Sequence, residues 1–340
     1  MKLRKPPTDS PTNAPRGVDG GLAAFLRHTY PGPRQFHKAL SLWPLLPAPD
    51  APRPNGLEYV PLADALEDGF VSVQEVDASG SVPHVRVENR AATAVLVLFG
   101  EELRGAKQNR VANASFLLPP REERVIDVSC VEQGRWGRRR GFFAAEDLCF
   151  GASAGTLSSA IRRKMLKKVS RSRARTGTYD ADQGEVWESV SERLAQSGVR
   201  SPSEAYADYA RSRQSDIGEM AQSFHVMKDA GQVGFVAAIG DEIVGLEAIG
   251  RGDVFARAFP TLLHAYAIDA ADAAQLREPG RLRFESPQAF LAAVASAPAR
   301  SGASLGMGQD LRLESDAVEG CALVANGALV HLTAFPHAAD

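Results

Sequence analysis

Polar side chains of several kinds follow two apolar runs of the chain, residues 95–99 and 125–131. The set comprises Glu101, Glu102, Arg104, Gln108, Asn109 and Arg110 after the first run, and Glu132, Arg135 and Trp136 after the second. Carboxylates, guanidinium groups and amides offer complementary acceptors and donors, so such a mixture at strand ends can converge on one ligand. We therefore expect a polar site at this place.

Each residue type in the set suits a different part of a ligand. The arginines can bind phosphate or carboxylate groups through paired hydrogen bonds, whereas the two amides suit a ribose, a base edge or another amide. Trp136 can stack on a sugar or base, although a Trp beside a strand end is more often core or lid. The glutamates would orient the cations or serve as a general base. Structural ion pairs, ligand binding and catalysis all remain open.

The alternation of side chains along a strand adds a constraint on the glutamates. If residues 95–102 form one continuous strand, either Glu101 or Glu102 must lie on its apolar face, and Glu132 likewise shares a face with Ile126 and Val128. A carboxylate at the edge of an apolar face is costly unless it is paired. This pattern favours Glu132 as a buried partner of an arginine.

Charge is distributed unevenly along the 340 residues, whose formal net charge is −2. Between residues 135 and 175, twelve Lys or Arg stand against Glu146 and Asp147, which leaves +10. The expected basic helix at 157–172 belongs to this segment and follows Arg138-Arg139-Arg140. It could follow a nucleic-acid backbone, but no recognised nucleic-acid motif accompanies it and aromatic residues are not interleaved. A solvated cationic helix face is the simpler interpretation.

Several classes of protein and site are disfavoured by the sequence. Three scattered cysteines do not form a disulfide framework, which favours a reducing, cytoplasmic location. No segment reaches the roughly 18 apolar residues of a membrane span. The histidines lack metal-ligand spacing, and no Gly-x-Ser-x-Gly or Cys-x-x-Cys motif occurs, so we expect no metal site and identify no catalytic residue.

The chain divides into three parts by composition. Residues 1–35 are rich in proline and hold only a short apolar patch, which predicts a disordered tail. Short apolar runs separated by turn residues predict a β-rich half at 36–150, as an antiparallel sandwich or partly open barrel. Residues 151–340 predict an α+β half. Strands at both ends of this ordered region suggest a shared sheet, and hence one α+β domain.

Periodicity and turn signals place the elements of the second half. The expected elements are helices around 157–169 and 186–194, a helix over 203–222 capped by Ser203, a hairpin at 233–249 around Gly240-Asp241, a helix at 253–270, a helix opening at Ser286-Pro287, and a closing hairpin around Asn326-Gly327.

The segments 100–110 and 128–136 also resemble the ARPP-1 family, named for its association with ADP-ribosylglycohydrolases and rhodanese-phosphatase superfamily proteins. Segments 233–245, 262–270 and 330–332 are similar to it too, and the resemblance spans about residues 36 to 335. It implies a link to ADP-ribose or nucleotide metabolism, and a functional association with ADP-ribosylglycohydrolase or phosphatase systems. It supplies no catalytic residue.

These observations lead to two hypotheses. In the first, a cytoplasmic protein binds an ADP-ribose-like or other phosphorylated nucleotide at the strand ends, with processing of that ligand left open. The arginines would meet the phosphates, and the amides the ribose or base. In the second, the protein is a nucleic-acid-binding or protein-interaction module that acts through the basic segment 135–175, while the strand-end residues are structural.

Overall fold

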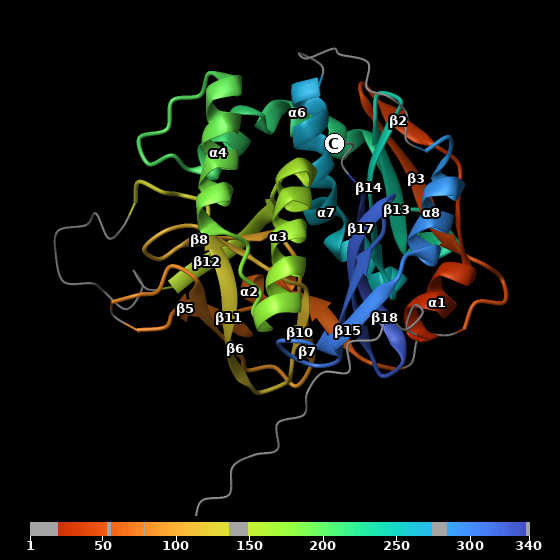
Figure 1. The fold of residues 1–340 in the computed structure, drawn as a ribbon, viewed down its shortest axis with the longest axis horizontal. Coiled ribbons are helices and arrows are strands. Elements are labelled where there is room, and N and C mark those ends of the chain that lie inside the picture. Colours follow the sequence, from red (N-terminus) through yellow and green to blue (C-terminus); the bar gives the residue numbers. More distant parts are fainter. Residues whose placement is uncertain (1–19, 53–55, 78, 136–148, 274–283, 338–340) are drawn as a thin grey trace, which may run out of the picture.

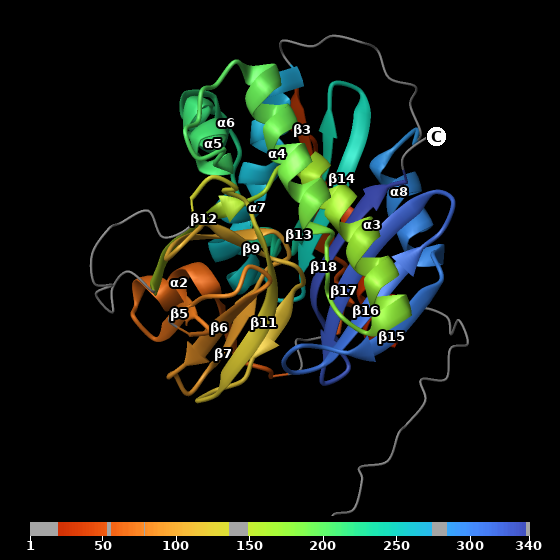
Figure 2. The ribbon, with the colours of Figure 1, turned by 60° about the vertical axis from the view of Figure 1, so that its left-hand side comes forward.

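Two bodies of β-structure lie side by side, with the long helices α3 and α7 between them (Figure 1, Figure 2). The computed structural model describes residues 20–52, 56–77, 79–135, 149–273 and 284–337, and for residues 149–154 it describes the backbone alone. Within these ranges no helix is both long and apolar enough to cross a membrane.

The larger body is a nine-stranded sheet in which every neighbouring pair is antiparallel. In spatial order its strands are β1 (Thr29–Pro31), β3 (Leu40–Pro47), β13 (Gly234–Ile239), β14 (Glu242–Ile249), β18 (Ala328–Pro336), β17 (Val318–Ala325), β16 (Gln309–Glu314) and β15 (Ala299–Ala303), and β2 (Gln35–His37) also pairs with β3. The sheet therefore combines strands from before residue 48 with strands from after residue 233.

The smaller body is a closed barrel. Its strands are β11 (Glu123–Cys130), β6 (His84–Asn89), β5 (Val71–Glu75), β12 (Cys149–Thr156), β8 (Glu101–Gly105) and β9 (Arg110–Ala112). A three-stranded sheet has the order β10 (Phe116–Leu118), β7 (Ala94–Val97) and β4 (Tyr59–Pro61), with β4 parallel to β7. Valines that alternate along β5 and β6 fill the barrel interior together with Leu103.

The helices pack mainly around and between these sheets. They are α1 (Gly20–Arg27), α2 (Leu62–Glu67), α3 (Ser159–Thr176), α4 (Gln183–Ser197), α5 (Tyr206–Ser212), α6 (Gln214–Ser223), α7 (Gly252–Ala273) and α8 (Pro287–Ser296), with a short 3-10 helix at Lys228–Ala230. The α+β class is confirmed, and of the two forms expected for the first half the structure has the barrel, which is closed.

Two local predictions are confirmed by backbone geometry. Asn326 and Gly327, which join β17 to β18, have φ angles of 50° and 74°, as a type I′ hairpin turn requires. Ser286 caps α8, because its hydroxyl oxygen accepts a hydrogen bond from the Ala289 amide at 3.1 Å, and Pro287 occupies the first helical position.

The disordered tail expected for residues 1–35 is wrong from residue 20 onward, whereas residues 1–19 lie outside the described residues. Residues 20–35 form α1, β1 and the start of β2, and both Leu22 and Leu26 are buried. Their side chains pack with Leu45, Val324 and Leu329 of the nine-stranded sheet. The short apolar patch is sufficient to order residues 20–35, because it packs on the core of the nine-stranded sheet and does not have to form a core of its own.

Two other expectations need correction. Residues 203–222 form two helices, α5 and α6, and Ser203 caps neither, because its hydroxyl donates to Glu132. Residues 95–102 are not one strand: β7 ends at Val97, and β8 begins at Glu101 after Gly100, whose φ is 78°. A Cβ atom on Gly100 would also lie 2.9 Å from the Cγ of Arg162.

Candidate functional site

Most of the predicted polar residues gather at one end of the barrel, where β8 and β11 end and β9 begins. We call this group the barrel-end cluster, and its members are Glu75, Glu102, Arg104, Gln108, Asn109, Arg110, Glu132 and Arg135. All of them except Arg104 and Arg135 are buried. The predicted residue Glu101 begins β8 at the other end of that strand, beside the turn that follows β7. Trp136 and Arg138-Arg139-Arg140 lie outside the described residues, so their predicted roles are not described by the structure.

Glu132 is held from three directions. Its Oε2 accepts a hydrogen bond from the Asn109 amide at 3.1 Å and forms an ion pair with Arg135 Nη2 at 2.7 Å, while Oε1 accepts a hydrogen bond from the Ser203 hydroxyl at 2.9 Å. An isolated bridge pairs its backbone with Ala205, just before α5. Glu132 therefore ties β11 to the β8–β9 turn and to the segment that leads into the helices.

Arg110 closes the interior of the barrel at this end. It lies opposite Leu103, a core residue, and therefore shares its inward face. Its Nη2 lies 4.0 Å from Oε1 of Glu75, and its Nη1 donates to Gln108 Oε1 at 3.0 Å. Burial lowers the pKa of Arg110, whereas the nearby Cys130 and Glu75 raise it. Arg110 is fully buried, so its side chain acts on the cluster from inside.

Glu102 faces the other side of the barrel wall. It lies opposite Val111, which packs with the core between the barrel and helices α3, α4 and α5. Its Oε2 lies 3.0 Å from both Nε and Nη2 of Arg104, while its Oε1 is buried without a hydrogen-bond partner among the described residues. Burial raises the pKa of Glu102, the charge of Arg104 lowers it and that of Glu132 raises it.

The remaining predicted residues have contacts within the protein. Gln108 Nε2 donates to the carbonyl of Glu132 at 3.0 Å, and Asn109 Oδ1 accepts from the Gly105 amide at 3.1 Å and from Arg135 Nη2 at 3.1 Å. Glu101 Oε2 accepts from the Leu98 amide at 3.0 Å and so stabilises the turn between β7 and β8. Both amides thus hold the shape of the β8–β9 turn.

Arg104 and Arg135 are the partly exposed cations of the cluster. Their side chains are 38% and 32% exposed, whereas those of their carboxylate partners Glu102 and Glu132 are 2% and 8% exposed. Arg135 also donates to the carbonyls of Ala106 at 2.8 Å and Gly105 at 3.3 Å, next to Arg104 in the chain. Each guanidinium is therefore fixed from behind while part of it faces solvent.

Two further residues of this region, Glu75 and His264, were not among the predicted site residues. Glu75 continues the inward alternation of Val71 and Val73 in β5, a signal that was present in the sequence. His264 comes from α7 and its Nδ1 lies 3.0 Å from the Thr156 carbonyl. Burial lowers the pKa of His264, and the charge of Arg104 lowers it further. Nothing in the local sequence links α7 to β8, so His264 could be found only from the fold.

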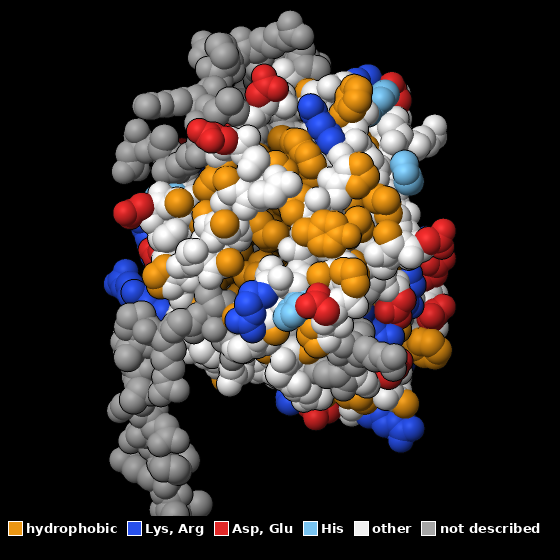
Figure 3. Space-filling model, turned by 90° about the vertical axis from the view of Figure 1, so that its right-hand side faces the viewer, with side chains coloured by type: hydrophobic (Ala, Val, Ile, Leu, Met, Phe, Trp, Pro, Cys, Tyr) orange, Lys and Arg blue, Asp and Glu red, His pale blue; other side chains and the backbone are white. Residues whose placement is uncertain are grey.

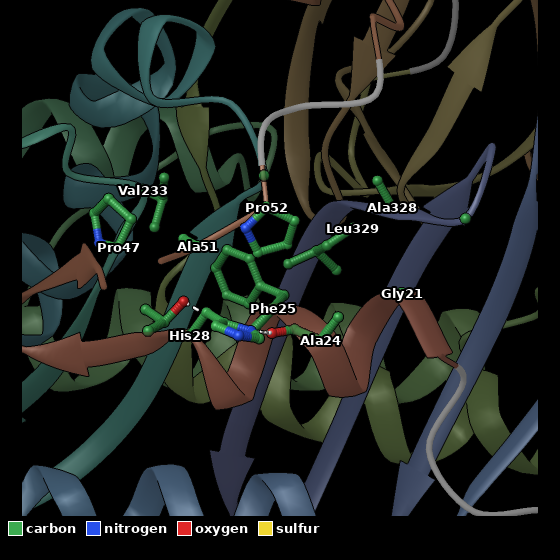
Figure 4. Close-up of a pocket in the computed structure, with 13 residues that line it drawn as sticks. Gly21, Ala24, Phe25, His28, Pro47, Ala51, Pro52, Val233, Ala328 and Leu329 are labelled. Carbon is green, nitrogen blue, oxygen red and sulfur yellow. Dashed lines mark hydrogen bonds between the residues drawn. The ribbon is translucent and has the colours of Figure 1, made fainter. Parts of the chain in front are cut away.

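A different kind of hollow lies on the far side of the nine-stranded sheet, where hydrophobic side chains gather over the face that carries α1 (Figure 3). It measures about 190 Å³ and is lined mainly by apolar residues, including Phe25, Pro52 and Leu329 (Figure 4). His28 also lines it, with Nδ1 2.8 Å from the Ala24 carbonyl. Its described lining contains no lysine or arginine, so it does not suit a phosphate group.

Comparison with known proteins gives one match. The family model described as "ARG and Rhodanese-Phosphatase-superfamily-associated Protein domain" covers residues 29–335. The chain belongs to the ARPP-1 family. No curated protein and no solved structure matches the chain. The ARPP-1 match includes β8, β9 and β11, and hence every described member of the barrel-end cluster.

The described residues of this ARPP-1 chain also limit the chemistry of the site. Among them, no group of three or more His, Cys, Asp or Glu is arranged to hold a metal ion. The cysteines with described side chains, Cys130 and Cys321, are buried and unpaired with each other. What the barrel end offers a ligand is guanidinium donors at its surface and a buried carboxylate oxygen behind one of them.

Proposed function

We propose that this ARPP-1 chain binds an ADP-ribose-like or other phosphorylated nucleotide ligand at the barrel end. The observation that carries the proposal is the pair of partly exposed arginines, Arg104 and Arg135, each backed by a buried glutamate. A guanidinium that is oriented in advance loses little conformational entropy when it binds phosphate, and it can donate two hydrogen bonds. The two arginines flank the same β8–β9 turn, so they can act on one diphosphate.

The buried members of the cluster would have supporting roles. Arg110 would add positive potential from inside the barrel, although its full burial excludes direct contact in this conformation. Gln108 and Asn109 would hold the turn and come close to the ribose or base only if the turn opened. Glu132 would fix Arg135 and the backbone of the β8–β9 turn.

Glu102 is the member of the cluster that could form a hydrogen bond with the sugar part of the ligand. Its Oε1 has no hydrogen-bond partner among the described residues, and burial raises its pKa. Glu102 is buried like Arg110, so it meets a ligand only if the side chain of Arg104 moves aside. Its carboxyl group can then accept a hydrogen bond from a ribose hydroxyl when ionised, or donate one when protonated. If the protein also processes its ligand, Glu102 is the residue we assign as general acid or base.

The family description supports the class of ligand, and not the site or a reaction. It associates the domain with ARG, which we interpret as ADP-ribosylglycohydrolase, and with the rhodanese-phosphatase superfamily. Proteins that handle ADP-ribose and phosphate esters share phosphorylated ligands of this kind, and a partner in the same system would bind a related compound. An association is not a reaction, so this support concerns the class of ligand.

The direct test is isothermal titration of the full chain with ADP-ribose, ADP and NAD, with ribose as a ligand that lacks phosphate. We expect binding of at least one of the phosphorylated ligands and none of ribose. Absence of binding by all three phosphorylated ligands would refute the proposal. Arg110→Ala is a poor probe, since removing a fully buried arginine would disturb the fold as well as the site.

A further inference from the structure

The basic helix α3 divides its cations between two groups. Eight Lys or Arg lie between residues 159 and 176. Four of them pair with carboxylates of this protein: Arg162 with Glu247 at 2.5 Å, Lys164 with Glu192 at 3.1 Å, Lys168 with Asp182 at 3.2 Å and also with Glu185, and Arg173 with Asp310 at 3.6 Å. These four are neutralised within the fold, and Arg162 is fully buried.

The other four cations are Arg163, Lys167, Arg171 and Arg175, and they have no ion pair with any described carboxylate. They recur every four residues and therefore lie along one side of the helix, about 6 Å apart along its axis. The expected solvated cationic face is thus only half correct: half of the cations of α3 are paired within the protein, and the other half are not.

The side of α3 that carries these four cations borders a hollow between α3 and the edge of the nine-stranded sheet, where α3 runs beside β15 and β16 (Figure 2). The hollow measures about 260 Å³. Lys167, Arg171 and Arg175 line it from α3, together with Ser170, and Arg300 lines it from β15. Cations from a helix and from a strand therefore face the same space.

Two acids border the same hollow, Glu314 and Glu319 at the paired ends of β16 and β17. Four cations against two carboxylates leave a net charge of +2 among its lining residues. Glu319 Oε1 lies 2.9 Å from Nε2 of His337, so this oxygen already has a partner within the protein. The excess positive charge is concentrated on the α3 side.

We propose that this hollow binds a chain of linked phosphates through Lys167, Arg171 and Arg175, with Arg300 on the opposite wall. Cations repeated along one line match an anion whose charges also repeat, better than they match a single phosphate. The described lining contains no Phe, Tyr or Trp, so it offers no platform for base stacking. Recognition is therefore of the phosphate chain, and it is independent of base sequence.

The test measures binding of the full chain to three probes of this chemistry. These are a fluorescent single-stranded RNA of mixed sequence, inorganic polyphosphate of similar phosphate count as its competitor, and inorganic phosphate. The test variant is Lys167→Gln/Arg171→Gln/Arg175→Gln. The matched control is Lys164→Gln/Lys168→Gln, which removes cations from the same helix that already pair with acids.

We expect the test variant to bind the RNA at least roughly tenfold more weakly than wild type. The slope of log K against log salt concentration should become shallower by about 2, as the loss of three phosphate contacts with a single strand implies. The control should keep affinity within about twofold, and inorganic phosphate should not compete. Competition by polyphosphate would identify the phosphate chain as the shared ligand; its failure, with RNA bound, would assign the site to nucleic acid.

Three outcomes would overturn the proposal: no binding even at low salt, equal losses in the test and control variants, or full binding by a test variant whose circular dichroism and melting are unchanged. The result is separable from nucleotide binding at the barrel end. The three substituted side chains do not belong to the barrel-end cluster, so ADP-ribose binding by the test variant should be unaffected.

Discussion

Glu102 and Glu132 lie at the same end of the barrel but differ in how their carboxylates are satisfied. Both oxygens of Glu132 accept hydrogen bonds, from Asn109 and Ser203, and the carboxylate also forms an ion pair with Arg135. Only Oε2 of Glu102 has a partner among the described residues, and that partner is Arg104. The first glutamate is a structural junction, whereas the second keeps unused hydrogen-bonding capacity.

Glu132→Gln should therefore lower the stability of the protein. The substitution weakens the pair with Arg135 and places an NH₂ group where one oxygen accepted a hydrogen bond. We expect the free energy of unfolding to fall by about 1–3 kcal/mol, less than for a fully buried pair because Arg135 is partly exposed. Urea denaturation measures this. An unchanged melting temperature combined with lost ligand affinity would show that Glu132 faces the ligand.

Glu102→Gln should behave in the opposite way. Burial raises the pKa of Glu102 above 4.5, so the unfolded chain loses this proton at a lower pH than the folded protein does. Wild-type stability therefore declines as pH rises from about 4.5 through the folded pKa, and the neutral variant lacks that decline. We expect the variant to equal or exceed wild type in urea denaturation at pH 8. A loss as large as that of Glu132→Gln would contradict this account.

Arg162 and Glu247 form a buried pair in the layer between α3 and the nine-stranded sheet. Both side chains are fully buried, and Glu247 Oε1 also accepts from Tyr266 at 2.9 Å and Thr333 at 3.0 Å. Glu247→Gln alone should cost about 3–5 kcal/mol, because it leaves a buried cation without its counter-charge. A double-mutant cycle with Arg162→Met should give a coupling of about 1–3 kcal/mol. Additive effects would mean that the pair itself contributes nothing.

Acid should destabilise the protein through the same layer. Burial disfavours the charged forms of both His331 and Glu247. It lowers the pKa of His331 below 6.5. By itself burial would raise the pKa of Glu247, but Arg162 and His331 hold that pKa at about 2. As pH falls below 6.5 the unfolded state gains the histidine proton first, and below 4.5 it gains the glutamate proton first. Unfolding free energies from pH 7 to 3 should fall in both intervals. In His331→Gln the fall in unfolding free energy just below pH 6.5 should disappear. If that fall persists, another group causes it.

Much of the fold was predictable because its signals are local. The Asn326-Gly327 turn, the Ser286-Pro287 helix start and the apolar stripes of α3 and α4 depend on residues close together in sequence, and the structure has all of them. The barrel-end residues were likewise recognisable from their types. What local patterns could not provide was the division of the cluster, with Arg110 inside the barrel wall and Glu102 outside it.

Residues 95–102 do not alternate between the faces of one strand, and the reason lies in the backbone at Gly100. A single strand would require β-structure that continues through Gly100, but the positive φ of Gly100 makes a turn that buries both Glu101 and Glu102. The close approach of Arg162, 62 residues later in an expected basic helix, requires a glycine there. Long-range contacts of this kind also explain why the α1 segment was mistaken for a tail, and why the pairing of half of the α3 cations was not foreseen.

Partly exposed arginines backed by buried glutamates are the proposed ligand contacts, and the barrel contains a matched control for one of them. Arg104 pairs with Glu102 two residues before it, and Arg124 pairs with Glu122 in the same sequence relationship. The two arginines are 38% and 45% exposed, but Glu102 is 2% exposed and Glu122 is 43% exposed. Only the first guanidinium is fixed by a buried carboxylate.

The most direct measurement is titration of ADP-ribose into wild type, Arg104→Gln and Arg124→Gln, with melting temperatures to confirm that each variant is folded. Loss of a charge-assisted contact to phosphate should weaken binding by Arg104→Gln by roughly tenfold to a hundredfold. Binding by Arg124→Gln should stay within about twofold of wild type. Equal affinities for all three proteins, or equal losses in both variants, would contradict the assignment of the barrel end as the ligand site.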